Sequence, residues 1–337
     1  MGGTSTANGT SPIPVIDFDR FLHGSSEEKK ATAKQVDDAF HNVGFVYIKN
    51  HGIPQEQVDK CFDWSAKFFA LPTEKKMLCP HPPGGSHHRG YSGMDVEKVS
   101  QNIYDRDEID KIRTAIPDTK ESFESGSVSD SYQPNIWPPP DVIPGFQPFM
   151  ESFYLRCAAL VHDVLRCLAT ALGMDPEALS DTHSEDLFQL RLLHYPSVPA
   201  KVLKEKERTR ISAHSDFGTI TLLFQDKVGG LEVEDQCHPG QFKPAPPVEG
   251  TCLVNIGDLM ERWTNGRWKS TVHRVGEPPI IDGDMCMPRY SIPFFSVANL
   301  DTIIDALPGC WDEVSNPKKH ETVTAGGYVQ MRMEALY

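Results

Sequence analysis

The sequence lacks the features that mark membrane, secreted and nucleic-acid-binding proteins. No stretch approaches the about 18 consecutive apolar residues of a membrane helix. Residues 1–10 are rich in Gly, Ser and Thr and hold no apolar signal segment. No dense run of Lys and Arg occurs, and 47 acidic against 33 basic residues give a net charge of -14. Such a surface repels polyanions, so we expect neither nucleic acid nor a membrane as partner.

Paired cysteine motifs are also missing. Eight cysteines occur, and none forms a C-x-x-C pair. This spacing disfavours a structural zinc site on the cysteines. Reduced thiols in a cytoplasmic protein are therefore the simplest interpretation. No internal repeat is visible, and the oligomeric state is left open.

The chain that remains has the composition of a globular protein with a sizeable core. It has 337 residues, of which 39% are hydrophobic and 24% charged. We expect a disordered lead at 1–11, a mainly helical part at 12–185 that contains a long site-lining loop region, a β-rich catalytic part at 186–300, and a helical tail at 301–337. The fold class is accordingly α+β.

Helix signals gather in the first half. Ser25 and Ser26 supply an N-cap for a helix from about residue 26 to 41. A second helix is expected to follow Pro54, and Leu71-Pro72 ends it. The longest apolar stripe at helical spacing runs over 146–172 and predicts a helix packed on a sheet. The tail is expected to hold a last helix at 312–316 or 328–336.

Short β-rich stretches fill the second half. Gly, Pro and Asn punctuate them, and Asn265-Gly266 is a strong hairpin signal. Regular spacing of this kind predicts an all-β sandwich or barrel. The expected strands lie at 187–195, 209–213, 217–224, 230–234, 251–256, 268–275 and 287–297.

The most informative chemistry lies in a possible metal-binding set. His214 and Asp216 are two residues apart, so in an extended chain both side chains face the same side. His273 lies in another strand-like run. Two imidazoles and one carboxylate on one face of an octahedron leave three positions open, as iron(II) oxygenase chemistry requires. An H-x-D tripeptide alone is weak, because it also occurs by chance.

A second pattern strengthens that interpretation. Arg289 and Ser291 share a face of a later β-rich run. A guanidinium with a neighbouring hydroxyl matches a carboxylate, and a 2-oxo diacid has a distal carboxylate that needs such a partner. An arginine inside a barrel with no anion to meet would be a costly buried charge. The two patterns together predict iron(II), 2-oxoglutarate and O2 as cofactor and cosubstrates.

These motifs stand in an order that resembles the isopenicillin-N-synthase-like family of iron(II)/2-oxoglutarate dioxygenases. The resemblance covers nearly the whole chain, from PVIDF and GFVYIKNHGIP to HSD, GGLEV, STVHRV and RYSIPFF. It implies a double-stranded β-helix (jelly roll) flanked by helices. It also implies that His214, Asp216 and His273 hold iron.

The resemblance further implies that Arg289 and Ser291 hold the 2-oxoglutarate carboxylate. Tyr195, in a segment similar to the family's N-x-Y-P, is a further expected cosubstrate contact. Leu193 replaces the asparagine that is frequent there, so one hydrogen bond is expected to be missing. A core aromatic with a satisfied hydroxyl is the alternative for Tyr195.

The alternation of side chains along a strand suggests which residues line the substrate pocket. If Tyr195 points inward, Arg191 does too, and the face of Arg289 and Ser291 continues to Phe295. Phe217 follows a metal ligand and is a candidate pocket wall. Plain core packing is the alternative for each aromatic, and a structural ion pair is the alternative for Arg191.

Within the family the chain is similar to fungal thymine dioxygenase and to dioxygenases of fungal secondary metabolism. Shared-looking stretches include RLLHYP and FGTITLLFQDKVGGLEV. In thymine dioxygenase, residues matching Arg191 and Phe295 grip the planar ring, and the residue matching Phe217 is a tyrosine. The resemblance implies hydroxylation or ring expansion of a planar aromatic or polyketide-derived molecule. An arginine beside aromatic side chains would suit such a molecule if it is rich in oxygen and anionic. The alternative is methyl hydroxylation of thymine.

Two other classes of protein fit part of this pattern. A zinc hydrolase would use the same three ligands plus water, but it leaves Arg289 and Ser291 unexplained. A non-catalytic barrel would not need an intact set of ligands. Metal analysis distinguishes the three classes.

Overall fold

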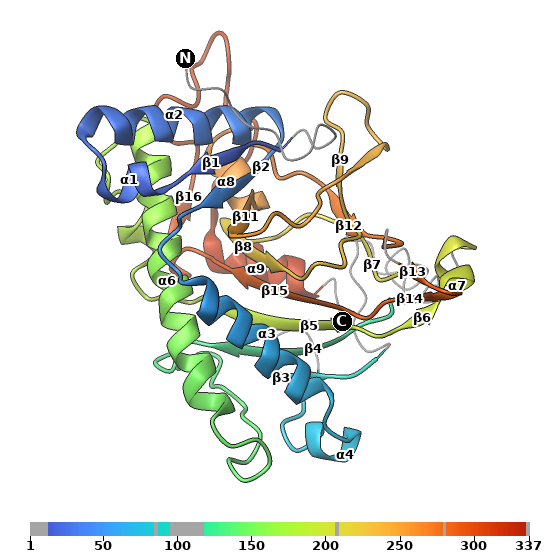
Figure 1. Cartoon of the computed structure of the whole chain (residues 1–337). Helices are drawn as coiled ribbons and strands as arrows, with labels where there is room; N and C mark the ends of the chain where they lie inside the picture. The colour runs from blue at the N-terminus through green and yellow to red at the C-terminus, as the bar shows by residue number, and fades with distance from the viewer. Residues whose placement is uncertain (1–12, 84–86, 95–117, 206–208, 279–280, 335–337) are drawn as a thin grey trace.

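A computed structural model describes residues 13–83, 87–94, 118–205, 209–278 and 281–334. Two β-sheets form the centre of the molecule, and the long helices α2 (Ser26–Asn42), α3 (Gln55–Phe69) and α6 (Phe146–Ala171) lie against the larger one (Figure 1). The lead at 1–11 lies outside the described residues. Within the described part of the chain, no helix is both long and apolar enough to span a membrane.

The larger sheet has eight strands in the order β1-β2-β11-β8-β15-β5-β4-β3. Only β1 and β2 pair in parallel, and every other neighbouring pair of this sheet is antiparallel. Their bounds are β1 Val15–Asp17, β2 Phe45–Lys49, β3 Gly90–Ser92, β4 Glu121–Gly126, β5 Gln189–Tyr195, β8 Ile220–Gln225, β11 Thr251–Ile256 and β15 Arg289–Phe295.

The smaller sheet has four antiparallel strands in the order β10-β9-β12-β7. They are β7 (Ile211–His214), β9 (Leu231–Glu234), β10 (Phe242–Pro244) and β12 (His273–Val275). Buried apolar side chains from both sheets meet in one cluster that includes Leu193, Leu231, Leu253 and Val275. The two sheets therefore face each other as the halves of a jelly roll, which confirms the predicted fold class.

Local sequence explains the helices well. Ser25 Oγ accepts a hydrogen bond from the Glu28 backbone amide, and the Glu28 carboxylate accepts one from the Ser25 backbone amide, so a capping box begins α2. α6 buries thirteen of its residues because its apolar stripe faces the large sheet and α2. The shorter helices are α1 Asp19–His23, α4 Thr73–Lys76, α7 Ala200–Lys204, α8 Asp258–Trp263 and α9 Ala325–Glu334.

Alternate side chains of β15 point to opposite faces of the large sheet. Tyr290, Ile292 and Phe294 pack into the core between the large sheet and the helices. Arg289, Ser291 and Phe295 point to the other face, into the space between the sheets. A strand covered on both sides is why RYSIPFF reads as an almost unbroken apolar run with a few polar residues at alternate positions.

Three features differ from the expectations or decide between them. Asn265-Gly266 does not form a hairpin: both residues have positive φ just after α8, where they end that helix. Residues 312–316 form a turn closed by an isolated bridge, and the last helix is α9. Small paired strands also occur, namely β6 Val198–Pro199, β13 Ile281–Asp282, β14 Met285–Cys286, β16 Ile303–Ile304 and β17 Val323–Thr324.

Candidate active site

A pocket opens between the two sheets, and the predicted site residues all line it. Its walls come from β5 and β15 of the large sheet and from β7, β9 and β12 of the small one. The nine residues are Arg191, Tyr195, His214, Asp216, Phe217, His273, Arg289, Ser291 and Phe295. Segments as far apart as β5 and β15 meet here because they are neighbouring strands.

Pairing of β7 with β12 sets His214 directly opposite His273. Their ring centroids are 4.4 Å apart. The Nε2 atoms of His214 and His273 lie 3.9 Å and 3.7 Å from Oδ1 of Asp216. Two imidazole nitrogens and a carboxylate oxygen thus converge on one point, a donor set that fits iron(II) with open positions.

Hydrogen bonds orient all three side chains. Nδ1 of His214 lies 2.8 Å from the Ser212 carbonyl and Nδ1 of His273 lies 3.1 Å from that of Thr271. Each ring donating from Nδ1 presents an Nε2 lone pair to an ion. Burial, together with the charge of His273, lowers the pKa of His214 to about 3, so the ring is neutral near neutral pH.

The two oxygens of the Asp216 carboxylate have different partners. Its Oδ2 accepts hydrogen bonds of 2.7 Å from Thr221 and of 2.7 Å from Asn255, while Oδ1 faces the histidines. Burial opposes its ionisation, but the two imidazoles and these hydrogen bonds outweigh burial and lower its pKa. Thr221 and Asn255 come from β8 and β11, and no local pattern singled them out.

Arg289 is a buried cation with an incomplete set of partners. It is 1% exposed. Its guanidinium donates to Ser291 Oγ at 3.1 Å and to Gln225 at 3.3 Å, and it lies 5.1 Å from the Tyr195 ring centroid. Its Nε finds no acceptor among the described residues. A buried guanidinium in this state favours a bound anion.

Arg210 is a second buried guanidinium that sequence reasoning missed. The segment around it looks like a solvated loop, yet Arg210 is 0% exposed and lies 5.9 Å from the Tyr195 ring centroid. Its Nη2 donates to the Met287 carbonyl, while its Nε and Nη1 have no acceptor among the described residues. Burial, reinforced by the nearby charge of Arg289, lowers its pKa. Both cations lie beside the Tyr195 ring, at one end of the pocket.

Arg191 lies on the same strand as Tyr195, nearer the start of β5. Its guanidinium carbon lies 6.0 Å from the Phe295 ring centroid, and its Nε lies 2.8 Å from Oε1 of Glu124. Glu124 is Arg191's cross-strand partner in β4 and is fully buried. The ion pair that was the alternative for Arg191 is therefore present, and the residue lines the pocket as well. Nothing in the sequence pattern marks Glu124, because the pairing of β4 with β5 is long-range.

The C-terminal helix completes the pocket. Val329 of α9 lines it, and Arg332 lies 4.3 Å from the Phe217 ring centroid while donating to Asp258 of α8. Arg332 is 2% exposed. The C-terminal tail therefore holds the Phe217 side of the pocket in place. Arg332 and Phe217 are 115 residues apart in the sequence, so local periodicity does not predict their contact.

Two family models match the chain. Residues 13–140 match the non-haem dioxygenase in morphine synthesis N-terminal family, and residues 187–298 match the 2OG-Fe(II) oxygenase superfamily. The second match contains all nine pocket residues.

Fungal proteins resemble the chain over almost its full length. The 2-oxoglutarate-dependent dioxygenase frbA of Dothideomycetidae sp. (strain 11243) is 39% identical, with 96% of this chain and 97% of frbA covered. The proline hydroxylase buaE of Petromyces alliaceus is 38% identical, with 96% and 99% covered. A full-length Neurospora crassa protein, crystallised in complex with alpha-KG and thymine, superposes with a TM-score of 0.88 at 41% identity, with 99% and 100% covered. The chain belongs to the 2-oxoglutarate- and iron(II)-dependent oxygenase family and is a dioxygenase that uses Fe(II), 2-oxoglutarate and O2.

Proposed function

We propose that His214, Asp216 and His273 hold the iron(II) of this dioxygenase. The observation that supports the proposal is the convergence of the three ligand atoms within 4.8 Å of one another, with both Nδ1 atoms engaged by carbonyls. Asp216 supplies the negative charge that partly balances the ion, and Thr221 with Asn255 keeps its second oxygen turned away.

Arg289, Ser291 and Tyr195 bind 2-oxoglutarate in this proposal. The distal carboxylate of the cosubstrate would meet Arg289 and Ser291, and the cationic end formed with Arg210 would favour a dianion. Held by these residues, iron(II) and 2-oxoglutarate would supply the activation of O2 and the oxidation of a substrate carbon, with succinate and CO2 as the other products. The protein contributes position, charge and an apolar enclosure that keeps water away.

The substrate in this proposal is a small planar ring that bears carbonyl or phenolate oxygens. Arg191 donates to a ring oxygen, Phe295 stacks on one face of the ring, and Phe217 forms a further wall. The outcome is hydroxylation or an oxidative rearrangement such as ring expansion, in fungal-type secondary metabolism. Free thiols at all eight cysteines support a cytoplasmic location.

Glu124 changes the expected charge of that substrate. Because its carboxylate lies 2.8 Å from Arg191, most of the arginine's charge is already balanced. A fully anionic ring therefore gains less here than the arginine alone suggests, and a neutral or weakly acidic ring suits the wall as well. Thymine, a neutral ring, is the second candidate, since the Neurospora protein crystallised with thymine is so similar.

A substrate screen tests the proposal. The enzyme is supplied with iron(II), ascorbate and 2-oxoglutarate, and succinate release and product mass are followed for thymine, phenolic polyketide aromatics and proline. We expect product with a planar ring, and none from Asp216→Ala, which loses a ligand and its charge. Coupled oxidation of proline but of no planar compound would overturn the substrate class. Full turnover by Asp216→Ala would overturn the metal assignment.

A further inference from the structure

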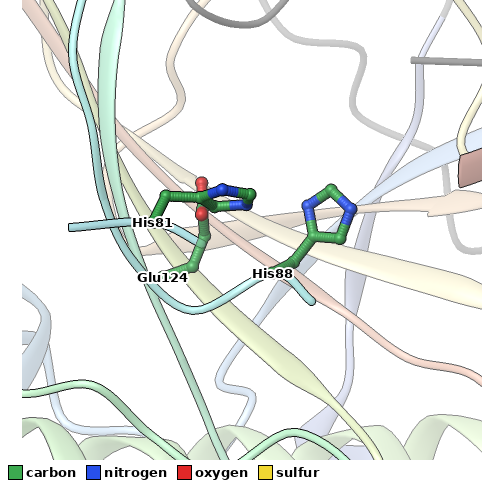
Figure 2. A group of neighbouring side chains, drawn as sticks. All are labelled: His81, His88 and Glu124. Carbon is green, nitrogen blue, oxygen red and sulfur yellow. The ribbon is translucent and has the colours of Figure 1, made fainter. Parts of the chain in front are cut away.

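A second group of potential metal ligands lies outside the iron site. His81 and His88 lie in the segment that joins α4 to β3, and Glu124 is in the neighbouring strand β4. Ligand atoms of the three residues all lie within 4.8 Å of one another. Figure 2 shows the His81 ring beside the Glu124 carboxylate, with the His88 ring to one side of them. The two imidazoles meet edge to face, with ring centroids 5.3 Å apart.

Glu124 is the centre of this group, and its two oxygens differ. Oε1 accepts a hydrogen bond of 2.7 Å from Ser122 and lies 2.8 Å from Nε of Arg191. Oε2 is buried and has no hydrogen-bond partner among the described residues, and the residue as a whole is 0% exposed. A buried carboxylate oxygen without a partner is costly, so this atom calls for a cation, a proton or a water molecule.

Both histidines are held in place by their backbones. The His81 amide donates to the Tyr91 carbonyl at 2.9 Å. The His88 amide donates to Gln133 at 3.1 Å, and its carbonyl accepts from Arg89 at 2.7 Å. Such anchoring fixes where the two rings can lie before any ligand arrives.

The His81 ring also has the orientation of a metal ligand. Its Nδ1 lies 2.6 Å from the Pro82 carbonyl. A ring that donates from Nδ1 presents the lone pair of Nε2, as His214 and His273 do in the iron site. In the iron set, the histidine Nε2 atoms lie 3.7–3.9 Å from the Asp216 oxygen, which is wider than the spacing of ligands around a bound ion. The ligand atoms of the second set are also apart, within 4.8 Å of one another. In both sets a modest movement of the side chains would bring the ligand atoms to a common ion.

We propose that His81, His88 and Glu124 form a second divalent metal site, suited to zinc. Imidazole with carboxylate favours Zn²⁺ over Ca²⁺ or Mg²⁺, which prefer oxygen ligands. Three protein ligands leave a fourth position for water, and His88 lines the substrate pocket, so the ion reaches the site from there. The positive charge of Arg191 opposes the ion, while the carboxylate of Glu124 lies between the two charges and offsets it.

A zinc ion here would fasten the segment between α4 and β3 to β4. It would act on structure rather than on the oxidation, since its ligand Glu124 pairs with Arg191 and none of its ligands belongs to the proposed iron or cosubstrate sets. By holding Oε2 of Glu124, it would also fix the carboxylate that pairs with Arg191. The proposal does not depend on the identity of the substrate.

Zinc binding by the full-length protein with the iron site disabled tests this. A His214→Ala, Asp216→Ala double variant is stripped with chelator and titrated with Zn²⁺ against a colorimetric zinc chelator. We expect one zinc per chain. Adding Glu124→Gln or His81→Ala should weaken binding at least about tenfold, because loss of a ligand costs no less than loss of a partner that orients one. Co²⁺ should give visible absorption bands typical of a four-coordinate site.

His87→Ala is the matched control. His87 precedes His88 directly, but its Nε2 lies 3.1 Å from the Pro134 carbonyl rather than in the cluster. This variant should keep the zinc, and circular dichroism verifies that each variant is folded. Absence of bound zinc in the double variant overturns the proposal, as does equal loss with His87→Ala and Glu124→Gln. Either result would mean that a proton or a water molecule, and not a metal ion, satisfies Oε2 of Glu124. Neither result would change the outcome expected from the substrate screen.

Discussion

Two buried arginines lie beside Tyr195 at one end of the pocket. Arg289 is almost fully buried, has an Nε without an acceptor among the described residues, and shares the Tyr195 ring with Arg210. Two buried cations at one end of a cavity raise the free energy of the unliganded protein. In the proposed binding mode a dianionic cosubstrate lowers it, so we expect the affinity for 2-oxoglutarate to depend on these residues.

Replacing Arg289 by Lys tests that link. Lysine keeps the charge but loses the planar donors that meet a carboxylate in two places. A lost buried contact of this kind costs about 2–5 kcal/mol, so the KM for 2-oxoglutarate should rise by at least about 30-fold. Iron binding should be retained, which metal analysis checks. Ser291→Ala, which removes one neutral partner, should have a smaller effect. An unchanged KM would place the anchor elsewhere.

Arg191→Ala separates the substrate wall from the cosubstrate end. Loss of a charge-assisted hydrogen bond to a ring oxygen costs about 1.5–3 kcal/mol, so substrate oxidation should fall by roughly 10- to 150-fold. Binding of iron and 2-oxoglutarate should be preserved. Phe217→Tyr, which adds a hydroxyl to the wall, should change substrate choice without affecting iron. If Arg191→Ala only unfolds the protein, its pair with Glu124 is structural and the substrate proposal loses its main polar support.

At the scale of elements, α9 reaches the pocket through Val329, which lines it, and Arg332, which lies over Phe217. Arg332 packs on the Phe217 ring and donates to Asp258, which joins the tail to α8 beside Asp216, a proposed iron ligand. This contact joins the C-terminal helix to the wall that we propose for the substrate.

Arg332→Gln should therefore raise the substrate KM and leave that of 2-oxoglutarate unchanged. The lost contact over the ring is worth about 1–2 kcal/mol, which corresponds to roughly 5- to 30-fold. Steady-state kinetics with each substrate varied in turn measures both constants. The control is Lys318→Ala, which removes an exposed pair with Asp305 in the same tail. Equal increases in both KM values would show general loss of structure.

At the scale of the whole molecule, buried neutral histidines make stability depend on pH. Burial lowers the pKa of His51 and of His183 to about 4 from an ordinary value of 6.5. The unfolded chain takes up these protons first as the pH falls below 6.5, so the folded state loses relative stability.

The free energy of unfolding should thus be highest above pH 6.5 and should decline between pH 6.5 and 4, by up to a few kcal/mol for the two residues together. Urea denaturation at a series of pH values measures this decline. His51→Gln should reduce its slope, because one of the two groups no longer titrates. A free energy that is constant from pH 7 to 4 would show that burial does not keep these rings neutral.

The sequence by itself determined the long helices and the faces of β5 and β15. Capping at Ser25, the apolar stripe of α6 and the alternation along β5 and β15 are local properties, and the structure has them as expected. Period two is enough to put Arg289, Ser291 and Phe295 on one side of a strand. The barrel itself came from the family resemblance, because local patterns do not specify which strands are neighbours.

Only the tertiary structure decided which residues meet across the sheets. Glu124 reaches Arg191 because β4 pairs with β5, Arg332 reaches Phe217 because α9 folds back on the barrel, and Arg210 is buried despite a polar neighbourhood in sequence. Asn265 ends a helix instead of forming a hairpin, since α8 precedes it. These contacts depend on chain segments far apart in sequence, and their free energies come from burial and charge that exist only once the two sheets have closed.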